Sequence, residues 1–272
     1  MERHLDLPDA HLAYDIEGSG ETILLMHGGF SPDWFVPAAS RIPDHRLITL
    51  QRAGYGGSKD LSGGASVAAH ADHAAAVLRA AGARRAHIVG HSAGASVGLQ
   101  LALAHPDLVG SLILFETAFP YAPEESPMPG MARAVEAAKR GAYEDAFDAF
   151  LSSVSGPGYR DAFVRELGEA GLRRAVDNTP YFFDSEGAAF RAWSFGPDEM
   201  ASVRAPLLLA VGGLGERLGT PHRARSAHLA RGIPQAETAV LPGVSHSLPM
   251  EDPDLVARTI TAFAARHPLG SA

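Results

Sequence analysis

Two side chains in this sequence have the types and the surroundings that an acyl-transfer reaction needs. Ser92 lies in the stretch Gly-His-Ser-Ala-Gly, which follows an apolar run and precedes an apolar stretch with helical spacing. A G-x-S-x-G pattern between a strand and a helix predicts a sharp turn that exposes the serine hydroxyl. His246 lies far downstream in a predicted loop, and imidazole is the side chain whose unperturbed pKa suits the base for a serine. We therefore predict a serine nucleophile and a histidine base.

Acyl transfer also requires two N–H donors that stabilise the negatively charged oxygen of the intermediate. Ala93 follows the nucleophile and is expected to supply one donor from the start of a helix. The second donor is expected at Gly29 or Phe30, with Gly29 preferred, in the turn that ends the stretch 22–30. His27 in the same stretch is interpreted as a residue that fixes the turn by a hydrogen bond.

The elements that must position these groups are visible as an alternation along the chain. Continuous apolar runs alternate with stretches of helical spacing, which predicts a mostly parallel sheet covered by helices on both faces. Ser66 is the expected N-cap of one helix, and Gly82 marks its end. The expected strands lie within 11–20, 22–29, 45–58, 86–90, 109–116, 205–212 and 236–243, and the expected helices within 66–82, 93–106, 221–232 and 252–267.

The segment from about 119 to 201 interrupts this alternation. It contains helical patterns at 131–155 and 159–177, no clear strand, and many aromatic residues. A helical insertion between two strands is expected to cover the carboxyl edge of the sheet, where open α/β sheets place their sites. We expect residues 1–118 and 202–272 to form the core and residues 119–201 to form a cap. The residues expected to line a substrate pocket are Phe30, His91, Tyr181, Phe182 and Trp193.

Composition narrows the classes of function. The 272 residues carry a formal charge of −8 without a basic tail or a run of basic residues, which argues against nucleic acid and anionic membranes as partners. The chain has no cysteine, so thiolate catalysis and thiolate metal sites are excluded. The first residues lack the apolar region of a secretion signal, and no apolar run reaches membrane-spanning length, so we expect a cytoplasmic protein. We expect a small-molecule substrate and neither a cofactor nor a metal; a homodimer is left open.

Two further patterns are interpreted as structural. His70 and His73 are spaced for one helix face, but no third ligand is evident nearby, so surface histidines are favoured over a metal site. The glycine-rich stretch 212–215 lacks the spacing and the downstream acid of a dinucleotide-binding fingerprint.

With these motifs in this order, the sequence resembles the α/β-hydrolase superfamily. The resemblance covers about residues 1–118 and 202–272 and is carried by the stretches HGG, GYGGS, GHSAG and LPGVSH, followed by EDPDLVA. It implies an α/β-hydrolase fold with an inserted helical cap, an esterase-like activity with a serine nucleophile, and no cofactor. One departure is that the strand before GYGGS ends in Gln-Arg-Ala-Gly instead of the usual Asp-Arg-Pro-Gly, which affects loop packing more than chemistry.

The resemblance also implies an acid that orients the histidine, and the sequence offers two candidates. In most members the acid follows the strand that here covers 206–212, where Gly215 stands at the expected position and Glu216 one place later. In a minority, including one branch of the haloalkane dehalogenases, the acid follows the preceding strand, and the similar stretch LFETAFP here contains Glu116. Glu116 is preferred because it ends a central strand, whereas Glu216 lies in a glycine-rich loop.

The nucleophile also separates this chain from those dehalogenases. They use an aspartate nucleophile and an asparagine in the oxyanion turn, where this sequence has Ser92 and Gly29. The sequence therefore predicts a serine hydrolase for a carboxylic ester, thioester or lactone with an apolar acyl or alcohol part. Two alternatives stay open: a C–C bond hydrolase or cofactor-free cyclase on the same triad, and a ligand-binding protein of this fold without turnover.

Overall fold

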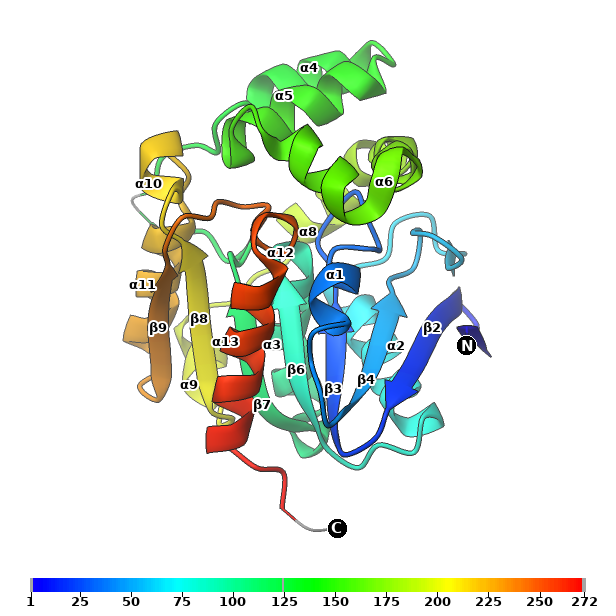
Figure 1. Ribbon diagram of the computed structural model, residues 1–272, viewed down its shortest axis with the longest axis vertical. Helices are drawn as coiled ribbons and strands as arrows, with labels where there is room; N and C mark the ends of the chain where they lie inside the picture. The colour runs from blue at the N-terminus through cyan, green and yellow to red at the C-terminus, as the bar shows by residue number, and fades with distance from the viewer. Residues whose placement is uncertain (1, 124, 271–272) are drawn as a thin grey trace.

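A mostly parallel sheet forms the centre of the molecule (Figure 1). The computed structural model describes residues 2–123 and 125–270, and nine strands of this part of the chain form one sheet. The strands are β1 (Glu2–Asp6), β2 (Ala10–Gly18), β3 (Glu21–Met26), β4 (His45–Gln51), β5 (Lys59–Asp60), β6 (Ala86–His91), β7 (Val109–Phe115), β8 (Leu207–Gly212) and β9 (Ala236–Leu241). Eight follow the order β1-β2-β4-β3-β6-β7-β8-β9, and β5 pairs with β2. The pairs from β4 to β9 are parallel, whereas β2 is antiparallel to its partners.

Helices cover both faces of the sheet, which explains the continuous apolar runs of its strands. The covering helices are α1 (Val36–Ala39), α2 (Val67–Ala80), α3 (Ala93–Ala104), α11 (His222–Gly232) and α13 (Pro253–Arg266). Successive side chains of a strand point to opposite faces, so Ile88 and Leu114 join one core cluster and Val89 and Ile113 the other. The first cluster also holds side chains of α2, α3 and α11, and the second those of α1 and α13. The predicted α/β architecture is confirmed.

Local sequence signals set the ends of these helices. The Ser66 hydroxyl accepts a hydrogen bond from the Ala69 N–H at 3.1 Å, as expected for an N-cap. Helix α2 ends just before Gly82, whose φ of 71° lies in the left-handed region that favours glycine. Both predictions for this helix are confirmed. Asp252 caps α13 in the same way, through a 2.8 Å bond from the Leu255 N–H.

Between β7 and β8, the described residues of 119–201 form helices and loops but no strand, and we call this segment the helical insertion. It comprises α4 (Met131–Lys139), α5 (Tyr143–Ser155), α6 (Tyr159–Asp177), α7 (Thr179–Tyr181), the π-helical turn η2 (Phe182–Glu186), α8 (Gly187–Arg191) and the start of α9 (Pro197–Ser202). In Figure 1, α4, α5 and α6 lie above the carboxyl ends of the parallel strands. Phe147, Phe163 and Leu172 form the centre of an apolar cluster of the insertion, which Phe30 and Trp34 of the core complete.

Several elements differ from the sequence predictions. The helical pattern at 131–155 is split into α4 and α5 around Gly141, whose φ is 73°. Helix α6 is kinked at Gly168, where φ is 69°. The edge strand β1 and the two-residue strand β5 carry too few apolar residues to be seen in the sequence.

The remaining short helices are η1 (Pro106–Leu108), α10 (Gly215–Leu218) and α12 (Leu248–Glu251). None of the helices among the described residues is both long and apolar enough to cross a membrane.

The interpretation of His70 and His73 as surface histidines is wrong. Both side chains are buried on the face of α2 that packs toward the sheet. The Nε2 atom of His70 lies 3.4 Å from Nη1 of Arg52, and that of His73 lies 3.1 Å from Oδ2 of Asp9. Half of the residues of α2 are alanine, and its two histidines reach polar partners beneath the helix that the sequence pattern does not reveal.

Five buried histidines are held in the neutral form by their surroundings: His27, His70, His91, His222 and His246. Burial is the main cause that lowers the pKa of each below its usual value, since a buried imidazolium loses its hydration. Neighbouring positive charge acts in the same direction, from Arg52 on the first two and from Arg225 on the last two. At these five positions the folded protein therefore binds fewer protons than the unfolded chain below about pH 6.5.

We expect the melting temperature to fall steadily as the pH is lowered from 7 toward 4. The stability that these neutral histidines contribute is fully present above their unfolded pKa and is lost as the pH falls toward the folded values. Each additional proton bound by the unfolded chain lowers the unfolding free energy by about 1.4 kcal/mol per pH unit. Circular dichroism melts at constant ionic strength measure the effect. His70→Gln should flatten the pH dependence, whereas His4→Gln, at an exposed position, should not; equal curves for all three proteins would contradict this explanation.

Candidate active site

Ser92 lies in the sharp turn between β6 and α3. Its φ of 52° and ψ of −116° fit neither element, and only close packing around the turn makes this backbone possible. A Cβ on Gly90 would lie 2.5 Å from the Gly94 carbonyl oxygen, and a Cβ on Gly94 would lie 2.2 Å from the Met26 carbonyl oxygen. Position 90 therefore needs glycine because α3 passes close to it, and position 94 needs glycine because the end of β3 does. Ala93 begins α3, and a first helical N–H has no acceptor within its own helix.

His246 lies in the loop between β9 and α12, beside a buried carboxylate. Its Nδ1 atom lies 2.9 Å from Oε2 of Glu116, and its backbone N–H donates to the Val154 carbonyl of the helical insertion at 3.4 Å. His246 and Ser92 line the same cavity, but none of the hydrogen bonds of the described residues joins their side chains. Catalytic hydrogen bonds are often long before substrate binds.

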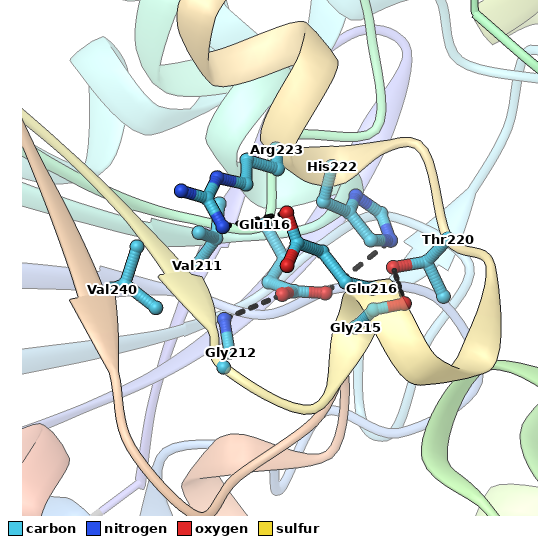
Figure 2. Close-up of a pocket in the computed structure, with 10 residues that line it drawn as sticks. Glu116, Val211, Gly212, Gly215, Glu216, Thr220, His222, Arg223 and Val240 are labelled. Carbon is cyan, nitrogen blue, oxygen red and sulfur yellow. Dashed lines mark hydrogen bonds and ion pairs between the residues drawn. The ribbon is translucent and has the colours of Figure 1, made fainter.

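Glu116 follows the last residue of β7 and is buried, with a φ of 49°. Its Oε1 accepts the Gly212 N–H at 2.7 Å, and its Oε2 lies 3.3 Å from Nε2 of His222 (Figure 2). The same Oε2 lies 2.9 Å from Nδ1 of His246. Burial raises the pKa of this carboxyl, and the His222 ring and the Gly212 N–H act in the opposite direction. The end of β8 thus holds one oxygen of Glu116 while the other faces two imidazoles.

The second candidate acid, Glu216, follows the glycine-rich loop after β8 and pairs with an arginine. The exposed Glu216 pairs with Arg223, with Nη1 and Oε1 2.6 Å apart (Figure 2). A Cβ added to Gly215, the position where the family's usual acid is expected, would lie 2.7 Å from Oγ1 of Thr220 and 3.9 Å from Oε1 of Glu116. A cavity of about 10 Å³, lined by Glu116, Gly215 and His222 among others, remains beside it. The carboxylate that contacts His246 therefore belongs to Glu116, which follows β7. It lies close to Gly215, where the usual acid is expected.

His222 is a site residue that the sequence analysis missed. It is the first residue of α11, is buried, and stacks on the His246 ring with 4.6 Å between ring centroids and 5° between planes. Its Nδ1 lies 3.4 Å from the Thr117 carbonyl oxygen. Burial lowers the pKa of His222 to about 3 and keeps the ring neutral at pH 7. The sequence offered one signal for His222: the residue follows directly after the loop in which most family members are expected to carry the acid.

The turn after β3 holds the predicted donor Gly29. Nε2 of His27 accepts the Arg52 N–H at 2.8 Å, so its Nδ1 carries the proton and donates to the Gly28 carbonyl at 2.7 Å. The interpretation of His27 as a residue that fixes this turn is confirmed. Within residues 2–123 and 125–270, the Gly29 N–H has no hydrogen-bond acceptor. The Gly29 carbonyl accepts from Nε1 of Trp34 at 2.8 Å, which fixes the next peptide as well.

A cavity of about 790 Å³ lies between the carboxyl edge of the sheet and the helical insertion. Ser92, Ala93 and His246 form part of its wall. Of the aromatic residues predicted for the pocket, Phe182 lines it. The other apolar side chains of the wall include Phe119, Met128, Met131, Val135, Phe150, Phe183 and Phe190, and its charged side chains are Glu125, Lys139, Asp184, Glu186, Arg191 and Arg225.

The other four predicted pocket residues do not line this cavity. Trp193 donates through Nε1 to Gln100 at 2.8 Å and packs on the main core, and Tyr181 donates to Asp60 at 2.7 Å. Phe30 is buried in the apolar cluster of the insertion. His91 points beneath the turn, with Nε2 2.9 Å from the His246 carbonyl oxygen. The many aromatic residues of the sequence indicated a pocket with an aromatic lining. They did not indicate which of the rings point into it.

We expect Gly90→Ala to destabilise the protein by roughly 2 kcal/mol or more, because its Cβ would meet backbone atoms of Gly94 and Ala95 that cannot move independently. Gly158→Ala is the matched control, since nothing lies within 4 Å of the added Cβ and the backbone is not left-handed. Urea unfolding measures both free energies. Equal stability of the two variants would show that the turn tolerates a side chain at position 90.

Comparisons with known proteins cover nearly the whole chain. The model of the family described as "Alpha/beta hydrolase family" matches residues 23–259. The curated protein "Putative carbamate hydrolase RutD" of Azorhizobium caulinodans is 28% identical over 268 residues, which cover 94% of this chain and 95% of that protein. The "2-(acetamidomethylene)succinate hydrolase" of Mesorhizobium japonicum is 26% identical over 270 residues, which cover 97% and 95%.

Solved structures share the same architecture. A thermophilic esterase from Thermogutta terrifontis aligns with a TM-score of 0.80 at 23% identity and covers 98% of this chain and 99% of its own. Est816, described as an N-acyl homoserine lactone degrading enzyme, aligns with a TM-score of 0.72 at 24% identity and covers 96% and 100%. At these identities the likeness is evidence for the fold alone.

Proposed function

We propose that this chain, which belongs to the alpha/beta hydrolase family, is a serine hydrolase that cleaves a carboxylic ester, thioester or lactone. The predicted α/β-hydrolase fold is confirmed, and the family makes the protein a hydrolase. The observation that carries the finer proposal is the contact between the Glu116 carboxylate and Nδ1 of His246, at the cavity that Ser92 also lines. In a serine hydrolase such a carboxylate orients the imidazole and stabilises the imidazolium that forms when the serine proton is taken up.

In the proposed mechanism, Oγ of Ser92 attacks the carbonyl carbon while its proton passes to Nε2 of His246. Glu116 stabilises the imidazolium through Nδ1–H, and the N–H groups of Gly29 and Ala93 stabilise the oxyanion. The intermediate collapses, and the leaving alcohol or thiol takes the proton from His246. Water then attacks the acyl-enzyme by the same route, which releases the acid and restores Ser92.

The size and lining of the cavity support a substrate with an apolar acyl or alcohol part. Its volume of about 790 Å³ lies within the range of small-molecule sites, and the rings nearest the catalytic groups include Phe150 and Phe182. The same attack on a carbonyl carbon would cleave a carbamate, and the name of the Azorhizobium relative supports that second candidate. A panel of p-nitrophenyl esters of graded chain length, with an aryl carbamate added, would order these substrates.

A fluorophosphonate probe tests the proposal. We expect the wild type to be labelled within minutes and Ser92→Ala to stay unlabelled, with kcat for an ester lower by at least ~10³, because no other group forms the acyl-enzyme. Circular dichroism should show an unchanged fold for the variant. An Ser92→Ala protein that keeps a tenth of wild-type activity would refute the serine mechanism, and a wild type that binds ligands but is never labelled would favour the binding protein.

The two candidate acids are separated by a matched pair of substitutions. Glu116→Gln should lower kcat by up to ~10⁴, since it loses the charge and the acceptor that hold the His246 tautomer. Glu216→Gln should cost less than ~10-fold, since it removes an exposed ion pair. Both changes replace one carboxylate by an amide, so the kcat ratio isolates position. Comparable losses in the two variants would remove Glu116 from its proposed role.

A further inference from the structure

A buried ion pair joins the core to the helical insertion beside the active site. Arg52 follows β4, Glu186 ends the π-helical turn η2, and both side chains are only 1% exposed. The Nη1 atom of Arg52 donates to Oε1 of Glu186, and Oε2 of Glu186 accepts from the Tyr55 hydroxyl at 2.6 Å. Burying such a pair costs so much hydration that it is weak evidence for stability alone. Another role for the pair therefore deserves a test.

The remaining donors of Arg52 bind the turn that contains Gly29. Nη2 donates to the Gly28 carbonyl at 2.9 Å, and Nε donates to the His27 carbonyl at 3.0 Å. A guanidinium is planar and offers its donors in a fixed fork, so it can hold two successive carbonyls and a carboxylate at once. Arg52 thus connects the backbone of the turn directly to Glu186 of the insertion.

These bonds determine the direction of the Gly29 N–H. In a planar trans peptide, the carbonyl of Gly28 and the N–H of Gly29 point in opposite directions. Arg52 and His27 hold that carbonyl on one side of the turn. On Gly28, a Cβ would lie only 3.0 Å from Cβ of Ser92, so this peptide packs against the nucleophile. The N–H on its other side is left without an acceptor among the described residues.

The same turn of the insertion supports Gly29 a second time. A Cβ on Gly29 would lie 2.5 Å from Cδ2 of Phe182, so the Phe182 ring fills the place of a side chain at position 29. Glycine is the residue with the widest choice of backbone conformations, so a donor at glycine must be held from outside. Phe182 and Glu186, the first and last residues of η2, supply contacts from two directions.

We infer that Arg52 and Glu186 are positioning residues that hold the Gly28–Gly29 peptide in the orientation that stabilises the oxyanion. The helical insertion is then a part of the catalytic apparatus and not only a wall of the substrate cavity. This inference rests on the proposed serine mechanism. An ion pair that merely clamps the insertion to the core would lower stability when broken but would not act selectively on the transition state.

The chain offers a matched control for this distinction. Arg174 of α6 also pairs across the insertion and the core, with its Nη2 2.7 Å from Oδ2 of Asp33, but its side chain is 55% exposed, and among the described residues its guanidinium donates to Asp33 alone. The test variants are Arg52→Lys and Glu186→Gln. Arg52→Lys keeps a cation beside Glu186, which favours folding, but a single ammonium cannot reach the carboxylate and both carbonyls together.

Each variant would be compared with the wild type in kcat and KM for a p-nitrophenyl ester and in Ki for a trifluoromethyl ketone, whose adduct with Ser92 carries an oxyanion. We expect Arg52→Lys and Glu186→Gln to lower kcat by roughly 10- to 100-fold with KM nearly unchanged, somewhat less than complete loss of an oxyanion donor. Ki should rise by the same factor as kcat/KM falls. Arg174→Gln should stay within about twofold of the wild type in all three quantities.

A folded Arg52→Lys with the kcat and Ki of the Arg174→Gln control would overturn the inference, whatever its melting temperature, and would leave the serine mechanism standing. If Glu186→Gln does not fold, Arg52→Lys decides alone. A wild type that the fluorophosphonate probe does not label would refute the proposed function, and the inference would fall with it.

Discussion

The buried carboxylate of Glu116 sets the arrangement of the site. This carboxylate, at the carboxyl end of β7, is buried away from water, so hydrogen-bond donors of the protein must satisfy its oxygens. The Gly212 N–H and His246 meet that need, and they come from the end of β8 and from the loop after β9. The need of one buried carboxylate for donors thus connects the ends of β7 and β8 with the His246 loop at one edge of the sheet.

Contacts to the helical insertion extend this arrangement. The His246 loop binds α5 through the Val154 carbonyl, and Ser247 donates to the Ser155 hydroxyl at 2.6 Å. The turn that contains Gly29 is bound through Arg52 to Glu186. Both loops that face Ser92 therefore take part of their geometry from residues inserted between β7 and β8. A rigid backbone at such a site lowers the reorganisation that the reaction requires.

The sequence predicted those features that depend on neighbours along the chain. The glycines around Ser92 predicted the turn, and alternation of apolar runs predicted the sheet and its helices. The preference for Glu116 over Glu216 came from a family resemblance and from the rigidity of a strand end, and the structure places Glu116 beside His246. That contact is geometric, and the catalytic role of Glu116 stays a prediction.

Features that depend on distant partners could not be predicted in this way. Arg52 and Glu186 are separated by 134 positions, and Glu116 follows β7 whereas His222 begins α11, so no local pattern reveals either contact. The direction of Trp193 depends on Gln100 and that of Tyr181 on Asp60, which is why their assignment to the pocket was wrong. Burial of His70 likewise depends on how α2 packs toward the sheet, where Nη1 of Arg52 lies 3.4 Å from Nε2 of His70.

The glycine at position 215 has a consequence for the charge on Glu116. A side chain there would begin 2.7 Å from Oγ1 of Thr220 and 3.9 Å from Oε1 of Glu116, so a second acid at this position would bring its carboxyl group close to the first. Like charges so close together in a buried site cannot both be ionised cheaply, and one of the two would keep its proton. An aspartate at position 215 would therefore compete with Glu116 for the charge beside His246. Glycine at this position spares Glu116 that competition.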